Sequence, residues 1–166
     1  MGPASGTFPH IVPLADMPEL IPILAEMFVA EWEPYYGANG PGDAAADLKE
    51  CLNRLELPIA FVALTTDVTV IGTAALKNES ISSHPHLGPW LAALVVAPEH
   101  RGQGVASALA ERIEQTACDL GFARIYTAMS HDELNVLHRP EWQPFDTAPT
   151  LRGSVTVFML ELAPGE

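Results

Sequence analysis

The stretch Leu91–Ala128 decides the fold of this chain, and it reads LAALVVAPEHRGQGVASALAERIEQTACDLGFARIYTA. Residues 91–96 are apolar at every position, as in a strand that is buried on both faces, and Pro98 ends this strand. A loop with two glycines, 101–104, then leads into a helix whose apolar residues recur at steps of three and four. Gly121 stands where a C-terminal cap belongs, and a second apolar strand follows it. This order predicts a βαβ crossover with the glycine loop at the carboxyl end of the first strand.

The glycine loop has the features of an anion-binding site. The first turn of a helix leaves backbone N–H groups unpaired, and Gly102 and Gly104 would let a pyrophosphate approach them closely. A nucleoside-triphosphate loop is excluded, because it would end in Gly-Lys-Ser/Thr and no lysine or paired hydroxyl stands here. A dinucleotide-binding fingerprint fits poorly. It needs a third small residue where Ser107 stands and normally lies in the first βα unit, whereas about ninety residues precede this one.

A third class of loop fits the residues. The segment 101–106, RGQGVA, preceded by VVAPEH at 95–100, resembles the Arg/Gln-x-x-Gly-x-Gly/Ala acetyl-coenzyme A signature of the GCN5-related N-acetyltransferase (GNAT) superfamily. The segment Pro89–Leu91 resembles the Pro-Trp-Leu that enters the fourth strand in bacterial members, and the resemblance is strong over 87–128 and looser elsewhere. It implies the α/β (mixed α+β) acyl-CoA N-acyltransferase fold, with a central twisted mixed sheet of about six to seven strands flanked by helices, as a single domain over residues 1–166.

The same resemblance implies acetyl-coenzyme A (acetyl-CoA) as the co-substrate and no metal. Loop amides would hold the pyrophosphate, strand residues would pair with the pantetheine arm, and an asparagine after the crossover would contact the cofactor. The implied cofactor-binding residues are Leu94, Val95, Val96, Arg101, Gly102, Gln103, Gly104, Val105, Ala106 and Asn135. Backbone donors near Val95 would also stabilise the charge that develops on the acetyl oxygen.

The composition limits the possible partners. A chain of 166 residues that is 48% hydrophobic can bury one core, which predicts one domain. A net charge of −13 disfavours nucleic acid and anionic membranes as partners and is compatible with a cationic amine. The two cysteines, together with the absence of a leader pattern or a long apolar run in the sequence, predict a cytoplasmic protein with reduced thiols. Residues 1–9 are expected to be flexible.

Outside the crossover, the residue patterns predict strands at 11–13, 59–64, 68–76 and 155–162 and helices at 16–32 and 43–57. In the superfamily, loops between the first two helices line the acceptor pocket. The candidate acceptor contacts are therefore Glu31, Trp32, Glu33, Tyr35 and Tyr36, together with Trp90. Acids beside aromatic rings would suit an amine through charge pairing and cation–π contact. The alternative is a capped helix end whose aromatic rings fold onto the core.

A general base is expected just before the strand that would hold the thioester. An alkylammonium has a pKa of about ~10 and must lose a proton before its nitrogen can attack. The polar segment 78–87 carries the candidates Glu79, His84 and His86. Two histidines with no third ligand at suitable spacing make a poor metal site, so no metal is expected. The alternative is that all three are exposed loop residues.

The sequence departs from the superfamily after the crossover, where an asparagine, a short helix, a tyrosine and then a glycine with an aromatic residue are usual. Asn135 matches the asparagine, but Leu137 occupies the tyrosine place and Glu141 replaces the glycine. The usual tyrosine acid therefore cannot be assigned. His138 is the nearest residue that could protonate the departing thiolate, and Tyr126 is the reserve candidate.

The predicted reaction is direct transfer of acetyl from acetyl-CoA to the primary amine of a small molecule or peptide, with both substrates bound in a ternary complex. Two alternatives remain open at this point: a non-catalytic coenzyme A-binding sensor or partner-binding domain, and an acyl-CoA thioesterase. Thioester turnover with and without amines would separate the three. A homodimer is expected from the resemblance alone.

Overall fold

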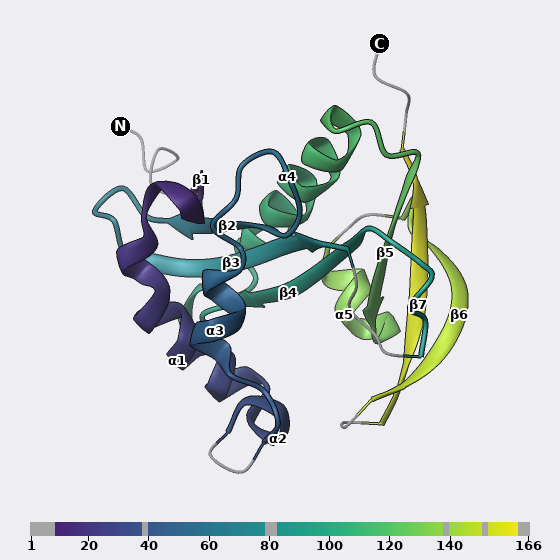
Figure 1. The fold of residues 1–166 in the computed structure, drawn as a ribbon, viewed down its shortest axis with the longest axis horizontal. Coiled ribbons are helices and arrows are strands. Elements are labelled where there is room, and N and C mark those ends of the chain that lie inside the picture. The colour runs from purple at the N-terminus through teal and green to yellow at the C-terminus, as the bar shows by residue number, and fades with distance from the viewer. Residues whose placement is uncertain (1–8, 38–39, 79–82, 138–139, 151–152, 163–166) are drawn as a thin grey trace.

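The computed structural model describes residues 9–37, 40–78, 83–137, 140–150 and 153–162. These residues form a seven-stranded sheet in the order β1-β2-β3-β4-β5-β7-β6 (Figure 1). Within it the β4–β5 pair is parallel and the other neighbouring pairs are antiparallel. The predicted mixed α/β fold with a mixed sheet and flanking helices is therefore confirmed.

The strands are β1 (His10–Pro13), β2 (Ile59–Leu64), β3 (Val70–Lys77), β4 (Trp90–Val96), β5 (Arg124–Met129), β6 (Gln143–Thr150) and β7 (Gly153–Glu161). The helices are α1 (Ile21–Glu31), α2 (Glu33–Tyr36), α3 (Ala44–Lys49), α4 (Val105–Asp119) and α5 (His131–Val136). Short 3-10 turns lie at Leu14–Asp16, Pro18–Leu20 and Pro98–His100. None of the helices in the described ranges is both long and apolar enough to cross a membrane.

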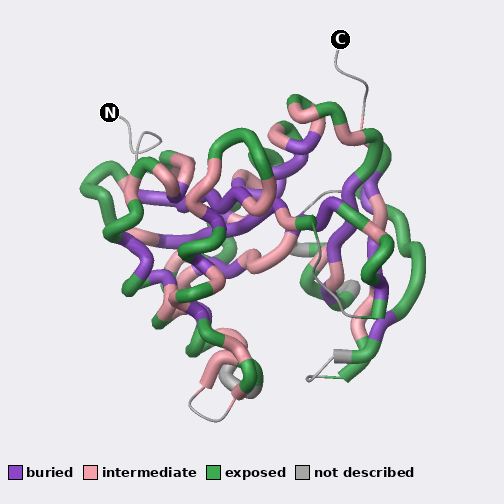
Figure 2. The backbone as a smooth tube through the Cα atoms, in the orientation of Figure 1, coloured by how far each residue is buried: buried purple, intermediate pink, exposed green. Residues whose placement is uncertain are grey.

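The sheet separates two layers of core. Helix α4 packs on one face, and α1 and α3 pack on the other (Figure 1). Alternate residues of β2 enter different cores, because successive side chains of a strand point to opposite faces: Phe61 packs with the α4 side and Val62 with the α1 side. All of β2 is buried, and buried backbone follows the central strands in Figure 2.

The first two helices are shorter than predicted. The first was expected over 16–32 but begins at Ile21, because Pro18 and Pro22 lack the amide donors that a continuous helix needs and 3-10 turns precede it. The second was expected over 43–57 but ends at Lys49. After it, Asn53 holds the chain in a non-helical path by donating its side-chain amide to the carbonyls of two residues, Glu50 and Pro58.

Strand β6 was not predicted, because two prolines interrupt its apolar pattern. Pro144 and Pro149 lie within it, and β6 is the last strand of the sheet. An edge strand tolerates proline because one side of it makes no ladder hydrogen bonds. The pairing of β6 with β7 also shifts register between Pro144 and Asp146, which marks a bulge at Phe145.

A third, smaller core lies on the half of the sheet formed by β5, β7 and β6. It contains Trp90, Tyr126, Ala148 and Val157, and Leu87 packs against them. Leu87 belongs to the described part of the β3–β4 connection, residues 83–89, which passes in front of β7 in Figure 1. This connection therefore covers the face of the sheet that no helix covers there in the described chain.

Candidate active site

Strand β4 carries a bulge at its centre. Thr73 of β3 pairs with Val95 and Ala75 pairs with Ala92, so two residues of β4, Ala93 and Leu94, lie opposite a single residue of β3. Ala93 has φ +56°, a left-handed conformation that is uncommon for a residue with a side chain. Bulges of this kind are frequent beside active sites, where they redirect backbone groups. The bulge lies within the strand predicted to hold the thioester.

Strands β4 and β5 separate soon after they begin to pair. Their ladder consists of two residue pairs, Trp90 with Tyr126 and Leu91 with Thr127. Ala97 donates its amide to Ile71 of β3, and because successive residues direct backbone groups to opposite edges, Val96 directs its N–H and C=O away from β3, toward the gap between β4 and β5, where the C=O accepts from Arg101 Nε. An extended amide chain could therefore lie in this gap as an added strand, which fits the pantetheine arm of coenzyme A.

The glycine loop joins β4 to α4. Gly102 has φ +79° and Gly104 has φ +86°, and a Cβ added to either residue would meet no atom of the described residues within 4 Å. Gly104 is the N-cap of α4 and, as a glycine, has no side chain to bond the first-turn amides. Open space beside exposed amides at a helix N-terminus fits a pyrophosphate. The loop residues 101–104 are exposed, whereas Val105 is buried beneath them.

Arg101 connects this loop to the end of α1. Its Nε donates to the Val96 carbonyl at 2.9 Å, and its NH2 group lies 3.1 Å from Glu31 Oε1. Glu31 was predicted to contact the acceptor, and the structure instead places it against the cofactor loop. The ion pair is largely exposed, so its main effect is to fix geometry and not to add stability.

The predicted aromatic residues at the end of α1 and in α2 form one cluster. Phe28 lies 5.2 Å from Trp32 and 5.5 Å from Tyr36 between ring centroids, and Tyr35 lies 4.8 Å from Tyr36. Tyr36 donates its hydroxyl to Asp47 Oδ2 at 2.6 Å. Burial and then this bond raise the pKa of Tyr36 far above its usual value, so the hydroxyl keeps its proton. Phe28 is buried and Tyr35 is 42% exposed.

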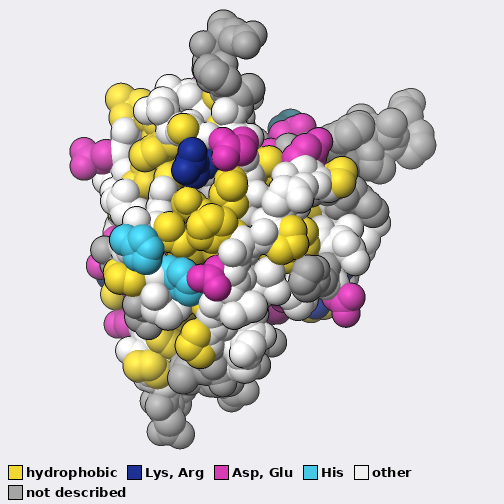
Figure 3. Space-filling view, turned by 90° about the vertical axis from the view of Figure 1, so that its right-hand side faces the viewer, with side chains coloured by type: hydrophobic (Ala, Val, Ile, Leu, Met, Phe, Trp, Pro, Cys, Tyr) yellow, Lys and Arg dark blue, Asp and Glu magenta, His cyan; other side chains and the backbone are white. Residues whose placement is uncertain are grey.

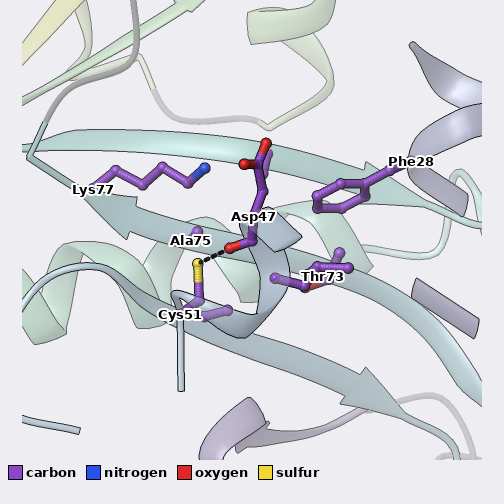
Figure 4. Close-up of a pocket in the computed structure, with 9 residues that line it drawn as sticks. Phe28, Asp47, Cys51, Thr73, Ala75 and Lys77 are labelled. Carbon is purple, nitrogen blue, oxygen red and sulfur yellow. Dashed lines mark hydrogen bonds between the residues drawn. The ribbon is translucent and has the colours of Figure 1, made fainter. Parts of the chain in front are cut away.

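Asp47 lines a narrow crevice that extends to the bulge (Figure 4). The crevice lies between α1, α3 and the sheet, and Lys77 and Ala93 line it together with Cys51 and Thr73. In Figure 4 the Asp47 and Lys77 side chains point toward one another. In this conformation the crevice is too narrow to hold an ordered water molecule.

The other polar groups of the crevice stay neutral. Cys51 donates its thiol to the Asp47 backbone carbonyl at 3.4 Å, and burial raises the pKa of Cys51 against the lowering influence of Lys77. The thiol is therefore a poor nucleophile. Thr73 donates its hydroxyl to the Phe61 carbonyl at 2.7 Å. Asp47 and Lys77 are thus the two charged groups that line the crevice, and sequence reasoning singled out neither.

The predicted bases differ in their placement. His84 is buried, its Nε2 lies 2.9 Å from Asp146 Oδ2 and its Nδ1 lies 2.7 Å from Ser83 Oγ, so it attaches the segment 83–89 to β6. The hydrogen bond from His84 lowers the pKa of Asp146. His86 is exposed, and Glu79 lies outside the described residues. Histidine and acidic side chains lie beside a hydrophobic area on this side of the molecule (Figure 3).

Trp90 was predicted to contact the acceptor, and the structure corrects this interpretation. Its side chain is completely buried, and its Nε1 donates to the Leu87 carbonyl at 2.8 Å. It stacks at 5.6 Å from Tyr126, which in turn lies 5.5 Å from Phe145. Trp90 therefore belongs to the buried cluster that packs β4 against β5, β6 and β7. Tyr126 forms the first of the two ladder pairs between β4 and β5, opposite Trp90.

The residues after β5 frame the other side of the loop. Asn135 is exposed on α5, as a cofactor contact should be. Leu137, in the usual tyrosine place, is buried in the core, and its carbonyl accepts a hydrogen bond from Ser107 of α4 at 2.7 Å. His138 lies outside the described residues. Among the described side chains, no group of three or more His, Cys, Asp or Glu residues could hold a metal ion.

The comparison with protein families agrees with this geometry. Residues 21–138 match the profile of the family described as the acetyltransferase (GNAT) family. The match covers well over half of the chain, and the chain belongs to the GNAT acetyltransferase family. Among curated proteins, none matches the sequence significantly.

Solved structures share the complete architecture. An aminoglycoside 6'-acetyltransferase type Ii has a TM-score of 0.72 at 18% identity, over 95% of this chain and 99% of that chain. A structure described as histone acetyltransferase HPA2 and related acetyltransferase from Corynebacterium glutamicum has a TM-score of 0.67 at 20% identity, over 95% and 98%. An aminoglycoside 6'-N-acetyltransferase complexed with coenzyme A has a TM-score of 0.68 at 17% identity, over 95% and 99%. At these identities the likeness establishes the fold and leaves the acceptor open.

Proposed function

We propose that the protein transfers acetyl from acetyl-CoA to the nitrogen of a primary amine of a small molecule or peptide, by direct attack in a ternary complex. The observation that carries this proposal is the position of the β4 bulge. Its Ala93 lies in the strand that borders the β4–β5 gap and also lines the crevice that contains Asp47. A cofactor chain and an acceptor amine could therefore approach one point of the sheet from opposite sides once the crevice, which is too narrow for a water molecule in this conformation, widens to admit the amine.

On the cofactor side, the backbone supplies most of the binding groups. Acetyl-CoA, when bound, supplies the activated acetyl thioester that an amine can attack. The amides of Gly102 to Val105 would hold the pyrophosphate at the N-terminus of α4. Val96 would pair with the pantetheine amides, and backbone donors at the bulge would stabilise charge on the acetyl oxygen. Arg101 would keep the loop against Glu31.

On the acceptor side, we assign to Asp47 the charge pairing with the acceptor amine that the sequence predicted for Glu31. Tyr36 holds one oxygen of the Asp47 carboxylate, which orients the other oxygen for an ammonium group. His86 is the described base candidate with an exposed side chain, whereas His84 is engaged through both ring nitrogens. Tyr126 of β5, the strand that borders the gap beside β4, is the described residue that we assign to return a proton to the thiolate.

The decisive experiment is a screen of primary amines in which coenzyme A release and the mass of the acetylated product are both measured. We expect release that depends on an amine and an equal amount of N-acetyl product. Release without an acceptor would indicate a thioesterase. Binding of acetyl-CoA without release for any amine would indicate a sensor or partner-binding domain.

The base is tested in the same assay with His86→Ala. If His86 accepts the proton, the acidic limb of the kcat/KM profile should disappear and kcat/KM should fall about 10²-fold at neutral pH. His10→Ala is a suitable control, because His10 is an exposed histidine on β1 at the opposite end of the sheet. An unchanged profile in His86→Ala would remove this residue from the mechanism.

A further inference from the structure

A second hollow lies at the far end of α4 from the glycine loop. It has a volume of about 260 Å³ and lies between the C-terminal half of α4 and the loop that joins α3 to β2. This loop arches beside α4 in Figure 1, and its backbone at the arch is exposed in Figure 2. The residues that matter for the argument are Arg54, Leu55, Phe61, Arg112 and Leu120. We call this hollow the α4 groove.

The floor of the α4 groove is apolar and its wall carries a cation. Phe61 and Ile59 of β2 belong to the buried core, and both line the groove. The Arg112 guanidinium lies 4.8 Å from the centre of the Phe61 ring, a cation–π contact. Within the described residues, the Arg112 side chain donates one long hydrogen bond of 3.5 Å, from its NH1 group to the Ile11 carbonyl. A guanidinium has five N–H donors, so most of those of Arg112 are free for a ligand.

The other charged side chains of the groove already have partners. Arg54 forms an ion pair with Asp16. Asp119 accepts a hydrogen bond from Gln115 at 2.8 Å. Arg112 is therefore the charged group of the groove best able to bind an added ion, and that ion would be an anion. Two of the eight basic residues of a chain with net charge −13 line this one groove.

At the rim of the α4 groove stands an apolar side chain that is not part of the hydrophobic core. Leu55 is 82% exposed at the arch of the loop and lines the groove. A large apolar side chain in this position can cover the body of a ligand that lies in the groove. The groove is slightly smaller than the smallest usual small-molecule sites, which have volumes of about 300 Å³. The ligand must therefore be small.

We propose that the α4 groove is a second binding site for a small carboxylic acid with an apolar body. The carboxylate binds Arg112, which is held over the Phe61 ring, through charge-assisted hydrogen bonds, and the apolar body lies against Leu55 and Leu120. The site is separate from the acetyl-transfer site, since Thr116 of the groove is twelve residues from Gly104, or roughly 18 Å along the helix. The proposal does not depend on the proposed function.

The test uses hexanoate as the probe, with hexan-1-ol as its uncharged match. Binding to the full chain is followed by two-dimensional amide NMR, with coenzyme A present at saturation so that the glycine loop is already occupied. We expect shifts in β2, in the C-terminal half of α4 and in the loop at 53–58, with a Kd for hexanoate about tenfold below that for hexan-1-ol.

Two variants locate the contacts. Arg112→Gln should raise the Kd for hexanoate about tenfold, and Arg112→Lys should raise it less because the charge is kept. Arg124→Gln is the matched control, because Arg124 is also an exposed arginine and its contact with Glu161 is loose at 4.0 Å. Leu55→Ser leaves the core intact and should weaken hexanoate and hexan-1-ol alike.

Three results would overturn the proposal. The first is equal affinity for hexanoate and hexan-1-ol. The second is an equal effect of Arg112→Gln and Arg124→Gln. The third is a set of shifts that leaves β2, the C-terminal half of α4 and the loop at 53–58 unchanged. If Arg112→Gln does not fold, Arg112→Lys and Leu55→Ser still decide the question, since unchanged affinities in both would also overturn it.

Discussion

Gly104→Ala separates the conformational role of the glycine loop from its binding role. Gly104 has φ +86°, and a residue with a side chain costs roughly 1–2 kcal/mol in that conformation. The variant should therefore lose about 1–2 kcal/mol of unfolding free energy. Within the described part of the chain no atom lies within 4 Å of the added methyl, so the methyl points into the space assigned to the pyrophosphate. Loss of one charge-assisted hydrogen bond there, worth about 1.5–3 kcal/mol, weakens coenzyme A binding about 10- to 100-fold.

Gly121→Ala provides the control within the same helix. Gly121 has φ +92° at the other end of α4, and a Cβ there also meets no atom within 4 Å. Both variants should lose similar stability in urea unfolding, but only Gly104→Ala should lose affinity for coenzyme A in a calorimetric titration. Parent-like affinity in Gly104→Ala, or equal loss in both variants, would refute the assignment of the loop to the pyrophosphate.

Three further predictions concern side chains. Asp47→Asn should raise the KM for a cationic amine about tenfold or more and leave coenzyme A affinity unchanged, and Tyr36→Phe should have a smaller effect of the same kind. An Asp47→Asn variant with an unchanged KM would exclude Asp47 from acceptor binding. Tyr126→Phe keeps the ring stack and should lower kcat about 10²-fold in turnover assays. A parent-like kcat would mean that solvent protonates the thiolate. The hydrogen bond from His84 lowers the pKa of Asp146 below its unfolded value of about 3.9, so this pair stabilises the fold above that pH and the contribution is lost as the pH falls through the lower folded value. Acid unfolding of Asp146→Asn should therefore depend less steeply on pH below about 4, and identical curves for variant and parent would show that the pair adds nothing.

The strand, loop and helix of the proposed cofactor site could be predicted from the sequence because their signals are local. A six-residue apolar run, two glycines and a periodic helix are continuous in the chain, and together they define a strand, a loop and a helix in fixed order. The structure places Gly102 and Gly104 in the left-handed conformation that glycine favours. The positions of β4, the loop and α4 followed from these residues alone.

The crevice that we propose for the acceptor could not be predicted because it depends on distant residues. Asp47 and Lys77 come from a short helix and from the end of a strand, and no spacing in the chain relates them. Ala93 gave no sign of a bulge, since alanine has no preference for positive φ. Glu31 is an acidic residue at the expected place in the sequence, but its carboxylate is paired with Arg101, which lies seventy residues away in the chain. Such pairings are set by packing and are not visible in local patterns.

The prolines at the two margins of the sheet restrict where another extended chain can join it. Pro13 lies in β1 at one margin, and Pro144 and Pro149 lie in β6 at the other. Proline has no N–H to donate, which hinders the growth of a sheet by pairing with a further strand. Between β4 and β5 the same sheet has a second place where pairing stops, since only two residue pairs join these strands, and this place lies inside the sheet and not at a margin. Prolines thus stand at both margins of the sheet, while the interruption between β4 and β5 contains none in its ladder.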